Sequence, residues 1–568
     1  MQMEWNILQP DTACVEMLRS DLNLHFITAI VLANRRITSP RTAGEFMHPT
    51  LDALPSPDTL DGMQRAVERT CTAIRKQQKI LIIGDYDVDG VTAAAVLFQF
   101  LKAAGADVTC HLPHRITEGY GFHPAQVSQM AVPRGIGLII TVDCGIGSRD
   151  AVAAAKRFDI DVIVTDHHNI GPTLPDACAI LNPRISGPSG PLFHLAGVGV
   201  AFYLAIALRA ALRACGWWRK RPEPNLKALC DLVALGTVAD IVPLMGANRI
   251  LTKTGLDQIN LLARPGLKAL LAANGLPPQP IGSDDIAFRL APRLNAAGRM
   301  AHAGLAFELL CATTADDARK LAETLNVLNQ RRQQIDHQIY SEIVDRLESR
   351  PDLLTRKSLV LAGAGWHQGV LGIVAAKLAA RYYRPVILIC TQGDVGKGSG
   401  RSVPGADLYT ALSRCAPLLT AFGGHRLAAG LTIPTANIEK LRSSFDAAVS
   451  EALPPEPLQP QLTIDCEVRF DQITPELLNE LERLEPFGAE NPAPLFMARD
   501  VHVSTACIVG QRHRRMALCQ ADHCRMVGAI QFNLDPEAPR AAFFERMAFR
   551  LQWNRYRGAR EIQIVVEA

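Results

Sequence analysis

The sequence lacks a long uncharged apolar segment, a secretory signal and a regular cysteine framework. No stretch of about 18 residues is free of charged residues or helix breakers, so we expect no membrane-spanning helix. The opening MQMEWNILQP carries an acid and an early proline where a signal peptide has a basic and then an apolar region. The 14 cysteines follow no spacing typical of disulfides, which favours reduced thiols. These absences favour a cytoplasmic protein that does not bind a membrane.

An excess of one charge is also missing. The net charge of +3 is too small to indicate a nucleic-acid partner by itself. Basic residues nevertheless gather in four short segments, which are 219–221, 331–332, 512–515 and 555–560. Such a segment can contact phosphates or can be ordinary solvated surface, and the sequence leaves both readings open.

The chain is too long for one hydrophobic core, so several domains are expected. From residue 63 short apolar segments alternate with helical ones, which predicts an α/β fold with a doubly wound parallel sheet. A long charged segment without proline or glycine at 318–349 predicts a helix that joins two lobes. The expected domains are a cap (1–62), a catalytic α/β domain (63–250), a helical connector (251–350), a second α/β domain (351–450) and a small antiparallel β-barrel (451–568) that follows a proline-rich linker.

Acidic and histidine residues follow three of the apolar segments. Asp85, Asp87 and Asp89 follow KILIIG, Asp143 follows GLIITV, and the DHH sequence at 166–168 follows DVIVT. Because open α/β sheets bind ligands at the carboxyl ends of their strands, we expect these side chains to meet at one edge. Gathered carboxylates are costly to bury without a cation, so the pattern predicts a metal-assisted phosphoesterase. A solvated acidic loop or a calcium loop is the alternative, although the glutamate that ends a calcium loop is missing.

Two further features belong to this metal site. His167 and His168 are adjacent, and neighbouring side chains on an extended chain point in opposite directions. We therefore expect one histidine to bind metal and the other to face substrate. Asp240 lies in the apolar segment LGTVADIVPL, where a buried carboxylate needs a proton, a partner or a metal.

The motifs GDYDVDG, VDCG, DHH and VADIVPL resemble, in order and spacing, the four motifs of the DHH phosphoesterase superfamily. Further segments resemble the RecJ family of single-strand-specific 5′ to 3′ DNA exonucleases, over residues 30 to 568. These segments include HRITEGYGFHP, RLAPRLNAAGRM, GWHQGVLGIVAAKL, GSGRS and AFGGHRLAAGLTI. The resemblance implies a DHH domain, a DHH-associated domain and a C-terminal OB-fold.

The resemblance also implies roles for individual residues. Two Mn²⁺ or Mg²⁺ ions would activate a water for hydrolysis of a phosphodiester. Their ligands would be Asp85, Asp87, Asp89, Asp143, His167 and Asp240, with Asp143 bridging. His168 would face the scissile phosphate, and Asp166 would orient the histidines by hydrogen bonding.

The second lobe would explain cleavage from one end. Ser399, Arg401 and Ser402, completed by Arg115, offer hydroxyl and guanidinium groups to a terminal 5′-phosphate, although GSGRS can also be a structural turn. Gly423, Gly424 and His425 resemble the substrate-contacting motif of the DHH-associated domain. We expect 5′-mononucleotides to be released in succession.

The C-terminal domain combines aromatic and basic residues, which suits the stacking of single-stranded bases beside a charged groove. These residues are Phe532, Trp553, Tyr556, Arg512, Arg514, Arg515, Arg555 and Arg557. The expected partners are single-stranded DNA, a single-strand-binding protein and a helicase, and the expected state is a monomer that acts in DNA repair and recombination. The alternatives are an inactive DNA-binding replication scaffold and a phosphodiesterase for nano-RNA or nucleotides, which is usually shorter and lacks the barrel.

Overall fold

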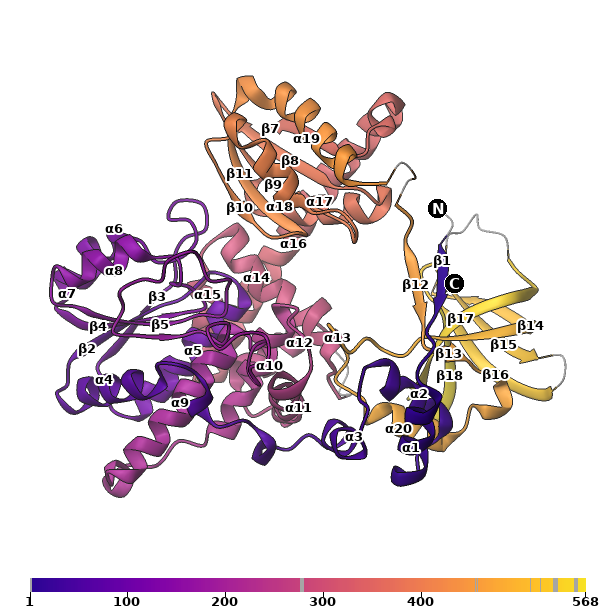
Figure 1. The fold of residues 1–568 in the computed structure, drawn as a ribbon, viewed down its shortest axis with the longest axis horizontal. Coiled ribbons are helices and arrows are strands. Elements are labelled where there is room, and N and C mark those ends of the chain that lie inside the picture. The colour runs from indigo at the N-terminus through magenta and orange to yellow at the C-terminus, as the bar shows by residue number, and fades with distance from the viewer. Residues whose placement is uncertain are drawn as a thin grey trace.

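The structure is a computed structural model that describes residues 3–275, 280–454, 456, 458–510, 512–520, 523–534, 540–555 and 560–568. Figure 1 shows three lobes, with the first sheet at the left, the second above it and a β-barrel at the right. The N-terminal helices lie beside the barrel.

The first lobe contains a five-stranded parallel sheet of order β3-β2-β4-β5-β6. Its strands are β2 (Lys79–Ile83), β3 (Val108–His111), β4 (Ile136–Val142), β5 (Asp161–Thr165) and β6 (Ala179–Leu181). The chain runs from β2 outward to β3 and returns past β2 to β4, so the strand order reverses at β2 and β4. Ligands bind at such a reversal in open α/β sheets. The predicted doubly wound sheet is confirmed.

Apolar side chains cover both faces of this sheet. Ile80 and Ile82 of β2 pack into the main core, whereas Leu81 and Ile83 pack into a smaller core on the opposite face. This alternation explains why a buried parallel strand has a continuous apolar sequence. The helices of the main core are α4 (Met63–Arg75), α5 (Val88–Ala103), α9 (Gly197–Ala214), α10 (Cys230–Ala239), α11 (Gly246–Asn260), α12 (Pro265–Ala273), α14 (Ala291–Met300) and α15 (Gly304–Cys311). On the opposite face lie α6 (Pro124–Gln126), a π-helical turn (Val127–Ala131), α7 (Val132–Arg134) and α8 (Arg149–Lys156).

One helix, α9, has the length and composition that could cross a membrane. It packs against α5, α4 and α10, and 61% of its apolar window is buried inside the protein. Its apolar sequence is therefore explained by its place in the core.

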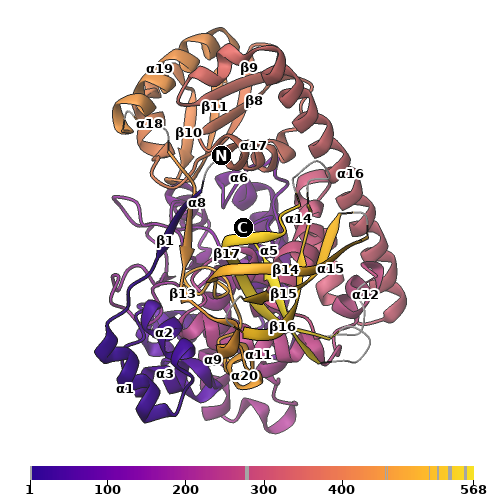
Figure 2. The ribbon, with the colours of Figure 1, turned by 90° about the vertical axis from the view of Figure 1, so that its right-hand side faces the viewer.

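The predicted long helix is α16 (Ala315–Ser349). The side chain of Thr314 caps its N-terminus by accepting a hydrogen bond from the backbone N–H of Asp317 at 3.2 Å. Leu325, in its first part, belongs to the core of the first lobe, whereas Ile343 and Leu347 belong to the core of the second. Figure 2 shows α16 running along one side of the molecule between the two lobes.

The second lobe has a mixed sheet of order β10-β11-β9-β8-β7, in which only the β7–β8 pair is parallel. Its strands are β7 (Leu359–Ala364), β8 (Val386–Gln392), β9 (Val395–Arg401), β10 (Ala421–Gly424) and β11 (Ala428–Pro434). Its helices are α17 (Gln368–Tyr382), α18 (Leu408–Arg414) and α19 (Ile438–Ala452).

The C-terminal lobe is a closed barrel, because β14 (Phe496–Val509) pairs with both β15 (His513–Gln520) and β17 (Phe543–Asn554). The remaining barrel strands are β16 (His523–Gln531) and β18 (Glu561–Val566), and the short β13 (Cys466–Glu467) pairs in parallel with the start of β14. The barrel was predicted to be antiparallel, but β16 and β18 pair in parallel because the chain crosses to β17 between them.

The N-terminal segment was expected to cap the domain that follows it, and the structure divides it: Leu60 packs into the core of the first lobe, whereas the helices before it pack against the barrel. Strand β1 (Glu4–Ile7) pairs in parallel with β12 (Gln461–Ile464). The helices α1 (Thr12–Leu22), α2 (Phe26–Asn34) and α3 (Pro40–Met47) share one hydrophobic cluster with the barrel and with α20 (Pro475–Glu482). Residues 4–47 therefore complete the barrel lobe, since their apolar side chains are buried against strands more than 400 positions away.

Candidate metal centre and substrate cleft

The acidic residues after β2 are positioned by a tight turn into α5. Asp87 caps this helix, since its Oδ1 accepts a hydrogen bond from the N–H of Gly90 at 3.1 Å. A Cβ atom at Gly90 would lie 2.6 Å from the nitrogen of Asp85, so only glycine fits here. Asp89 lies in the first turn, and its carboxylate accepts hydrogen bonds from the N–H groups of Gly197 and Val198 at the start of α9.

Asp143 lies at the end of β4 with an unusual backbone. Its φ of 58° is in the left-handed region, which a non-glycine residue seldom adopts outside functional or tightly constrained sites. Its Oδ1 lies 3.1 Å from Nε2 of His167. A Cβ atom at Gly197 would lie 2.5 Å from the same oxygen, so the start of α9 approaches this carboxylate as closely as glycine allows.

The structure brings together all six predicted metal ligands. Their ligand atoms form overlapping groups, in which Asp85 and Asp87 share Asp143, and Asp89 and Asp240 share His167. His168 also lies within reach of Asp143 and His167. The sharing of Asp143 and His167 makes this one continuous cluster.

Several atoms of the cluster are buried without a hydrogen-bond partner. These atoms are Oδ1 of Asp85, Oδ1 of Asp143 and Nε2 of His167. Unpaired buried acceptors are costly, and carboxylate oxygens with imidazole nitrogen suit Mn²⁺ or Mg²⁺. The residues present therefore fit the two divalent cations that the sequence predicts.

Burial also disfavours the ionised form of these carboxylates. Desolvation, with the neighbouring charge of Asp87, raises the pKa of Asp89 to about 7. Desolvation and the charges of Asp89 and Asp87 raise the pKa of Asp240 to about 9, and the pKa values of Asp85 and Asp143 are raised as well. A bound cation would replace these protons and offset the repulsion.

Asp166 organises the two histidines around its own carboxylate. Its Oδ1 accepts hydrogen bonds from the backbone N–H groups of His167 at 2.7 Å and His168 at 3.0 Å. The same oxygen accepts a 2.7 Å hydrogen bond from Nδ1 of His168, and Oδ2 accepts one from the N–H of Ile146. Burial alone would lower the pKa of His168, but the hydrogen bond and charge of Asp166 raise it to about 9. His168 is therefore a cation at neutral pH in the metal-free protein.

The expectation that the two histidines point in opposite directions is wrong. Their ring centroids lie 4.5 Å apart, and both rings approach Asp143. The hydrogen bonds to the Asp166 carboxylate hold the His168 ring beside Asp166 and Asp143. Burial lowers the pKa of His167 to about 3, which keeps its imidazole neutral and able to bind a metal.

Three of the residues predicted to bind a terminal phosphate, Ser399, Arg401 and Ser402, lie on or directly after β9 of the second lobe. Oγ of Ser399 and the guanidinium of Arg401 lie side by side, at 3.1 Å and 3.0 Å from where a Cβ atom on Gly372 would be. Ser402 differs from its two predicted companions, since its hydroxyl donates a hydrogen bond to the carbonyl of Ala406 at 2.9 Å. Ser402 therefore shapes the turn that follows β9.

Arginines from three separate segments converge beside Ser399. Burial, and then the charge of Arg115, lowers the pKa of Arg401. Arg299 of α14, which the sequence analysis did not select, has its pKa lowered to about 9 by burial and then by Arg115 and Arg401. The guanidinium of Arg115 lies 4.6 Å from the centre of the Tyr86 ring. Mutually repelling guanidinium groups next to the metal cluster are suited to a phosphate anion.

One contact joins the two lobes at the cluster. Nδ2 of Asn169, directly after the DHH sequence, lies 3.2 Å from Nδ1 of His425. Gly424 has a φ of 142°, and a Cβ atom there would lie 2.3 Å from the carbonyl oxygen of Ala428. A Cβ atom at Gly423 would have no such neighbour within 4 Å. Gly424 and His425 help line a cavity of about 460 Å³ that also includes Asp166 and His168.

Comparison with known proteins agrees with this geometry. Family models match at residues 79–237 (DHH family, N-terminal domain), 355–451 (DHHA1 domain) and 464–568 (RecJ OB domain). The single-stranded-DNA-specific exonucleases RecJ of Salmonella typhimurium and Escherichia coli are 40% and 39% identical, each over 89% of this chain and 90% of the relative. This chain belongs to the RecJ family.

Solved RecJ structures share the fold. RecJ of Thermus thermophilus in complex with Mn²⁺ matches with a TM-score of 0.83 at 29% identity, over 100% of this chain and 79% of that one. The complex of RecJ from the same organism with Mg²⁺ matches with a TM-score of 0.77 at 28% identity, over 100% of this chain and 78% of that one. The expected ions are thus those present in these RecJ structures.

Three further residues hold the backbone of the DHH sequence or of Asp143 and were missed in the sequence analysis. Nε of Arg184 donates to the carbonyl of His167 at 2.6 Å, and Nδ2 of Asn182 donates to the carbonyl of His168 at 3.0 Å. The hydroxyl of Tyr120 donates to the carbonyl of Asp143 at 3.3 Å. The polar segment NPR directly after the β6 strand was the available signal for the first two.

The structure divides the aromatic and basic residues of the barrel between its surface and its interior. Arg514 is buried and donates to the carbonyl of Ala541, and Arg555 forms an ion pair with Glu482. Phe532 is exposed, as are Arg512 and Arg515, whereas Trp553 is half-buried. Tyr556 and Arg557 lie outside the described residues.

Proposed function

We propose that this protein is an exonuclease specific for single-stranded DNA that hydrolyses phosphodiesters with two Mn²⁺ or Mg²⁺ ions. One observation carries the proposal: a cluster of buried metal ligands, three of which have an atom without a hydrogen-bond partner, lies beside arginines from both lobes. The relatives named as single-stranded-DNA-specific exonucleases support it.

Each group has a defined task in this reaction. Asp85, Asp87, Asp89, Asp143, His167 and Asp240 would hold the ions. When bound, such ions polarise the phosphate, activate water as a nucleophile and stabilise the leaving oxygen. The cationic His168 faces the same space and would stabilise charge that develops on the scissile phosphate. Asp166 keeps that imidazole in place.

We propose that the enzyme starts at the 5′ end. Arg115, Arg299, Arg401 and Ser399 would bind a terminal 5′-phosphate while the first phosphodiester meets the metal cluster. Release of 5′-mononucleotides follows, since each cleavage leaves a new 5′-phosphate for the same pocket. His425 and the backbone at Gly423 would contact the strand between the two sites, because Asn169 and His425 join the lobes there.

The two alternatives make different predictions. An inactive replication scaffold would not need a complete ligand set, and the six ligand positions here are all filled and brought together. An enzyme for nano-RNA or nucleotides would not need the closed barrel. We also propose that the protein acts in the cytoplasm as a monomer in DNA repair and recombination, where a helicase and a single-strand-binding protein supply unpaired ends.

The decisive experiment is digestion of an oligonucleotide labelled at its 5′ or its 3′ end. With Mn²⁺, mononucleotides should be released from the 5′ end first, and EDTA should abolish release. Asp143→Asn is the matched inactive variant, because it removes the charge shared by the two halves of the cluster and keeps the side-chain shape. Release from the 3′ end, or full activity of Asp143→Asn, would contradict the proposal.

A further inference from the structure

Two large apolar side chains near the metal centre are unusually exposed. Phe288 is 77% exposed and Ile241 is 75% exposed, the highest values among the large hydrophobic residues that the structure describes. Single exposed apolar residues are common on protein surfaces. These two, however, line the same cavity.

The backbone holds both side chains in uncommon conformations. Ile241 has a φ of 59°, and a β-branched residue in the left-handed region is a true outlier. Phe288 lies in a π-helical turn, Ile286–Leu290, and such turns occur often at functional sites. Conformations of this kind cost free energy and persist where they serve a function. Both of them direct an apolar side chain to one cavity.

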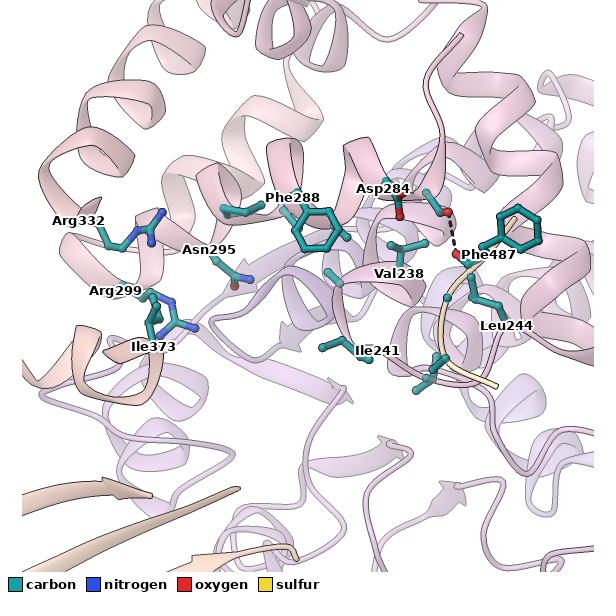
Figure 3. Close-up of a pocket in the computed structure, with 18 residues that line it drawn as sticks. Val238, Ile241, Leu244, Asp284, Phe288, Asn295, Arg299, Arg332, Ile373 and Phe487 are labelled. Carbon is teal, nitrogen blue, oxygen red and sulfur yellow. Dashed lines mark hydrogen bonds between the residues drawn. The ribbon is translucent and has the colours of Figure 1, made fainter. Parts of the chain in front are cut away.

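The cavity has a volume of about 520 Å³ and extends from Arg299 of α14 to Phe487, in the segment that leads to the barrel. Figure 3 shows Phe288 in its middle, Arg299 and Arg332 at one end, and Leu244 and Phe487 at the other. At the far end, Oγ of Ser283 donates to the carbonyl of Phe487 at 2.7 Å, which ties the segment leading to the barrel to the first lobe. The cavity therefore begins beside the phosphate-binding arginines and ends where the barrel lobe begins.

The residues that line the cavity indicate which kind of ligand it binds. Ile241 lines the cavity and directly follows Asp240, one of the predicted metal ligands. Arg299, which we propose binds the terminal 5′-phosphate, supplies positive charge at one end of the cavity, whereas the cavity wall is largely apolar. An aromatic face with a nearby guanidinium group suits a nucleotide, whose base stacks and whose phosphate pairs with the cation.

We propose that this cavity binds nucleobases of the strand on the 3′ side of the scissile phosphodiester, with Phe288 as the stacking platform and Ile241 as the opposing apolar wall. The inference rests on the proposed function and extends it. The cavity extends from Arg299 to Phe487, in the segment that leads to the barrel, so a strand that passes from the metal centre to the barrel would reach it. Stacking is tolerant of sequence, which suits a site that successive nucleotides of one strand would occupy in turn.

The experiment combines a protein variant with modified oligonucleotides. Phe288→Ala should lower kcat/KM for release of the first nucleotide by about 5-fold to 100-fold, the effect expected for loss of one stacked base. For the wild-type protein, an abasic residue in the second or third position from the 5′ end should cause a similar loss. In Phe288→Ala the same abasic residue should cause no further loss, because the stacking partner is already gone.

The controls separate stacking from folding and from general apolar contact. Phe288→Trp should keep the wild-type rate, whereas Phe288→Leu, which has no aromatic face, should behave like Phe288→Ala. Phe158→Ala removes another exposed phenylalanine (51% exposed) that does not line the cavity, and should have no effect. Equal melting temperatures would show that the side chain acts on the strand and not on the fold.

Two results would overturn this inference while leaving the proposed function intact. One is an unchanged kcat/KM for Phe288→Ala while the wild-type protein degrades the oligonucleotide normally. The other is a loss in Phe288→Ala that adds fully to the loss from the abasic residue. If the wild-type protein releases no nucleotides at all, the proposed function fails, and this inference fails with it.

Discussion

The guanidinium of Arg249 lies 3.7 Å from the centre of the Phe46 ring and donates a 2.8 Å hydrogen bond from Nε to the carbonyl of Phe46. Its terminal nitrogens donate to the carbonyls of residues 483–486. One buried side chain of the first lobe therefore holds both the N-terminal segment and the segment that leads to the barrel.

Replacing Arg249 with Leu should loosen the barrel lobe. Several buried carbonyls would lose their donors, at a cost of about 1–3 kcal/mol for each group left unsatisfied. We expect a lower urea midpoint and faster proteolysis near residues 483–486. Arg41→Leu is the matched control, because Arg41 lies on α3 with a side chain that is 84% exposed, and should leave both measurements unchanged. A stable and protease-resistant Arg249→Leu protein would contradict this role.

This attachment shows what the sequence could not predict about the fold. The parallel sheet was predictable, because the alternation of apolar strands and helices is local. The association of the N-terminal helices with the barrel depends on apolar residues more than 400 positions apart, such as Leu18 and Phe470 in one cluster. Periodicity marks such residues as buried but does not identify the surface that buries them.

The metal-free protein should lose stability as pH rises. The folded-state pKa values of Asp89 and Asp240 are raised to about 7 and about 9, whereas carboxyl groups titrate near 4 in an unfolded chain. Between these values the folded state binds more protons than the unfolded state, so the free energy of unfolding falls with rising pH. In EDTA, the melting temperature should therefore decrease from pH 6 to pH 9.

Bound metal should remove the pH dependence of the melting temperature, because a cation replaces the protons on Asp89 and Asp240. The increase in melting temperature caused by Mn²⁺ should be larger at pH 9 than at pH 6. Asp240→Asn provides the control, since it removes one titrating group and should flatten the pH dependence in EDTA. A melting temperature that rises with pH in EDTA would show that these carboxyl groups are not protonated in the metal-free fold.

Asp166→Asn should shift the pH profile of the reaction. In the wild-type protein Asp166 raises the pKa of His168 to about 9, overcoming the opposite effect of burial. If protonated His168 assists the reaction, activity is present below this pKa and is lost as pH rises through it. Without the negative charge the pKa of His168 falls, so the alkaline limit of kcat should move to lower pH. We also expect kcat to drop by about 10-fold to 100-fold, as for other groups that orient a catalytic histidine.

The measurement is a pH profile of kcat with saturating Mn²⁺, together with the metal content of each variant. An unchanged metal content would show that the effect acts through His168 and not through loss of ligands. An alkaline limit at the same pH in both proteins would contradict the assignment of this limit to deprotonation of His168.

The site was predictable to the extent that it depends on strand ends. Asp85, Asp143 and His167 meet because carboxyl ends of neighbouring parallel strands share one edge of a sheet. Arg299 was missed because it projects from α14, a helix whose sequence gives no sign of which lobe it faces. The orientation of His168 was mispredicted because it follows from hydrogen bonds to Asp166, which override the alternation of an extended chain.

Ser399 and Ser402 are three residues apart, and the structure separates their roles. Oγ of Ser399 lies beside Arg401, whereas the hydroxyl of Ser402 is bonded to the carbonyl of Ala406. Ser399→Ala should therefore reduce the preference for a 5′-phosphorylated over a 5′-hydroxyl oligonucleotide, by about 5-fold if one charge-assisted hydrogen bond of about 1 kcal/mol is lost. Ser402→Ala should leave this ratio unchanged and lower only the melting temperature. The comparison uses the ratio of kcat/KM for the two oligonucleotides, so a general loss of activity cancels. An equal effect of Ser399→Ala and Ser402→Ala on the ratio would show that both hydroxyls contribute to binding the 5′-phosphate. That result would contradict the separate roles given to the two serines.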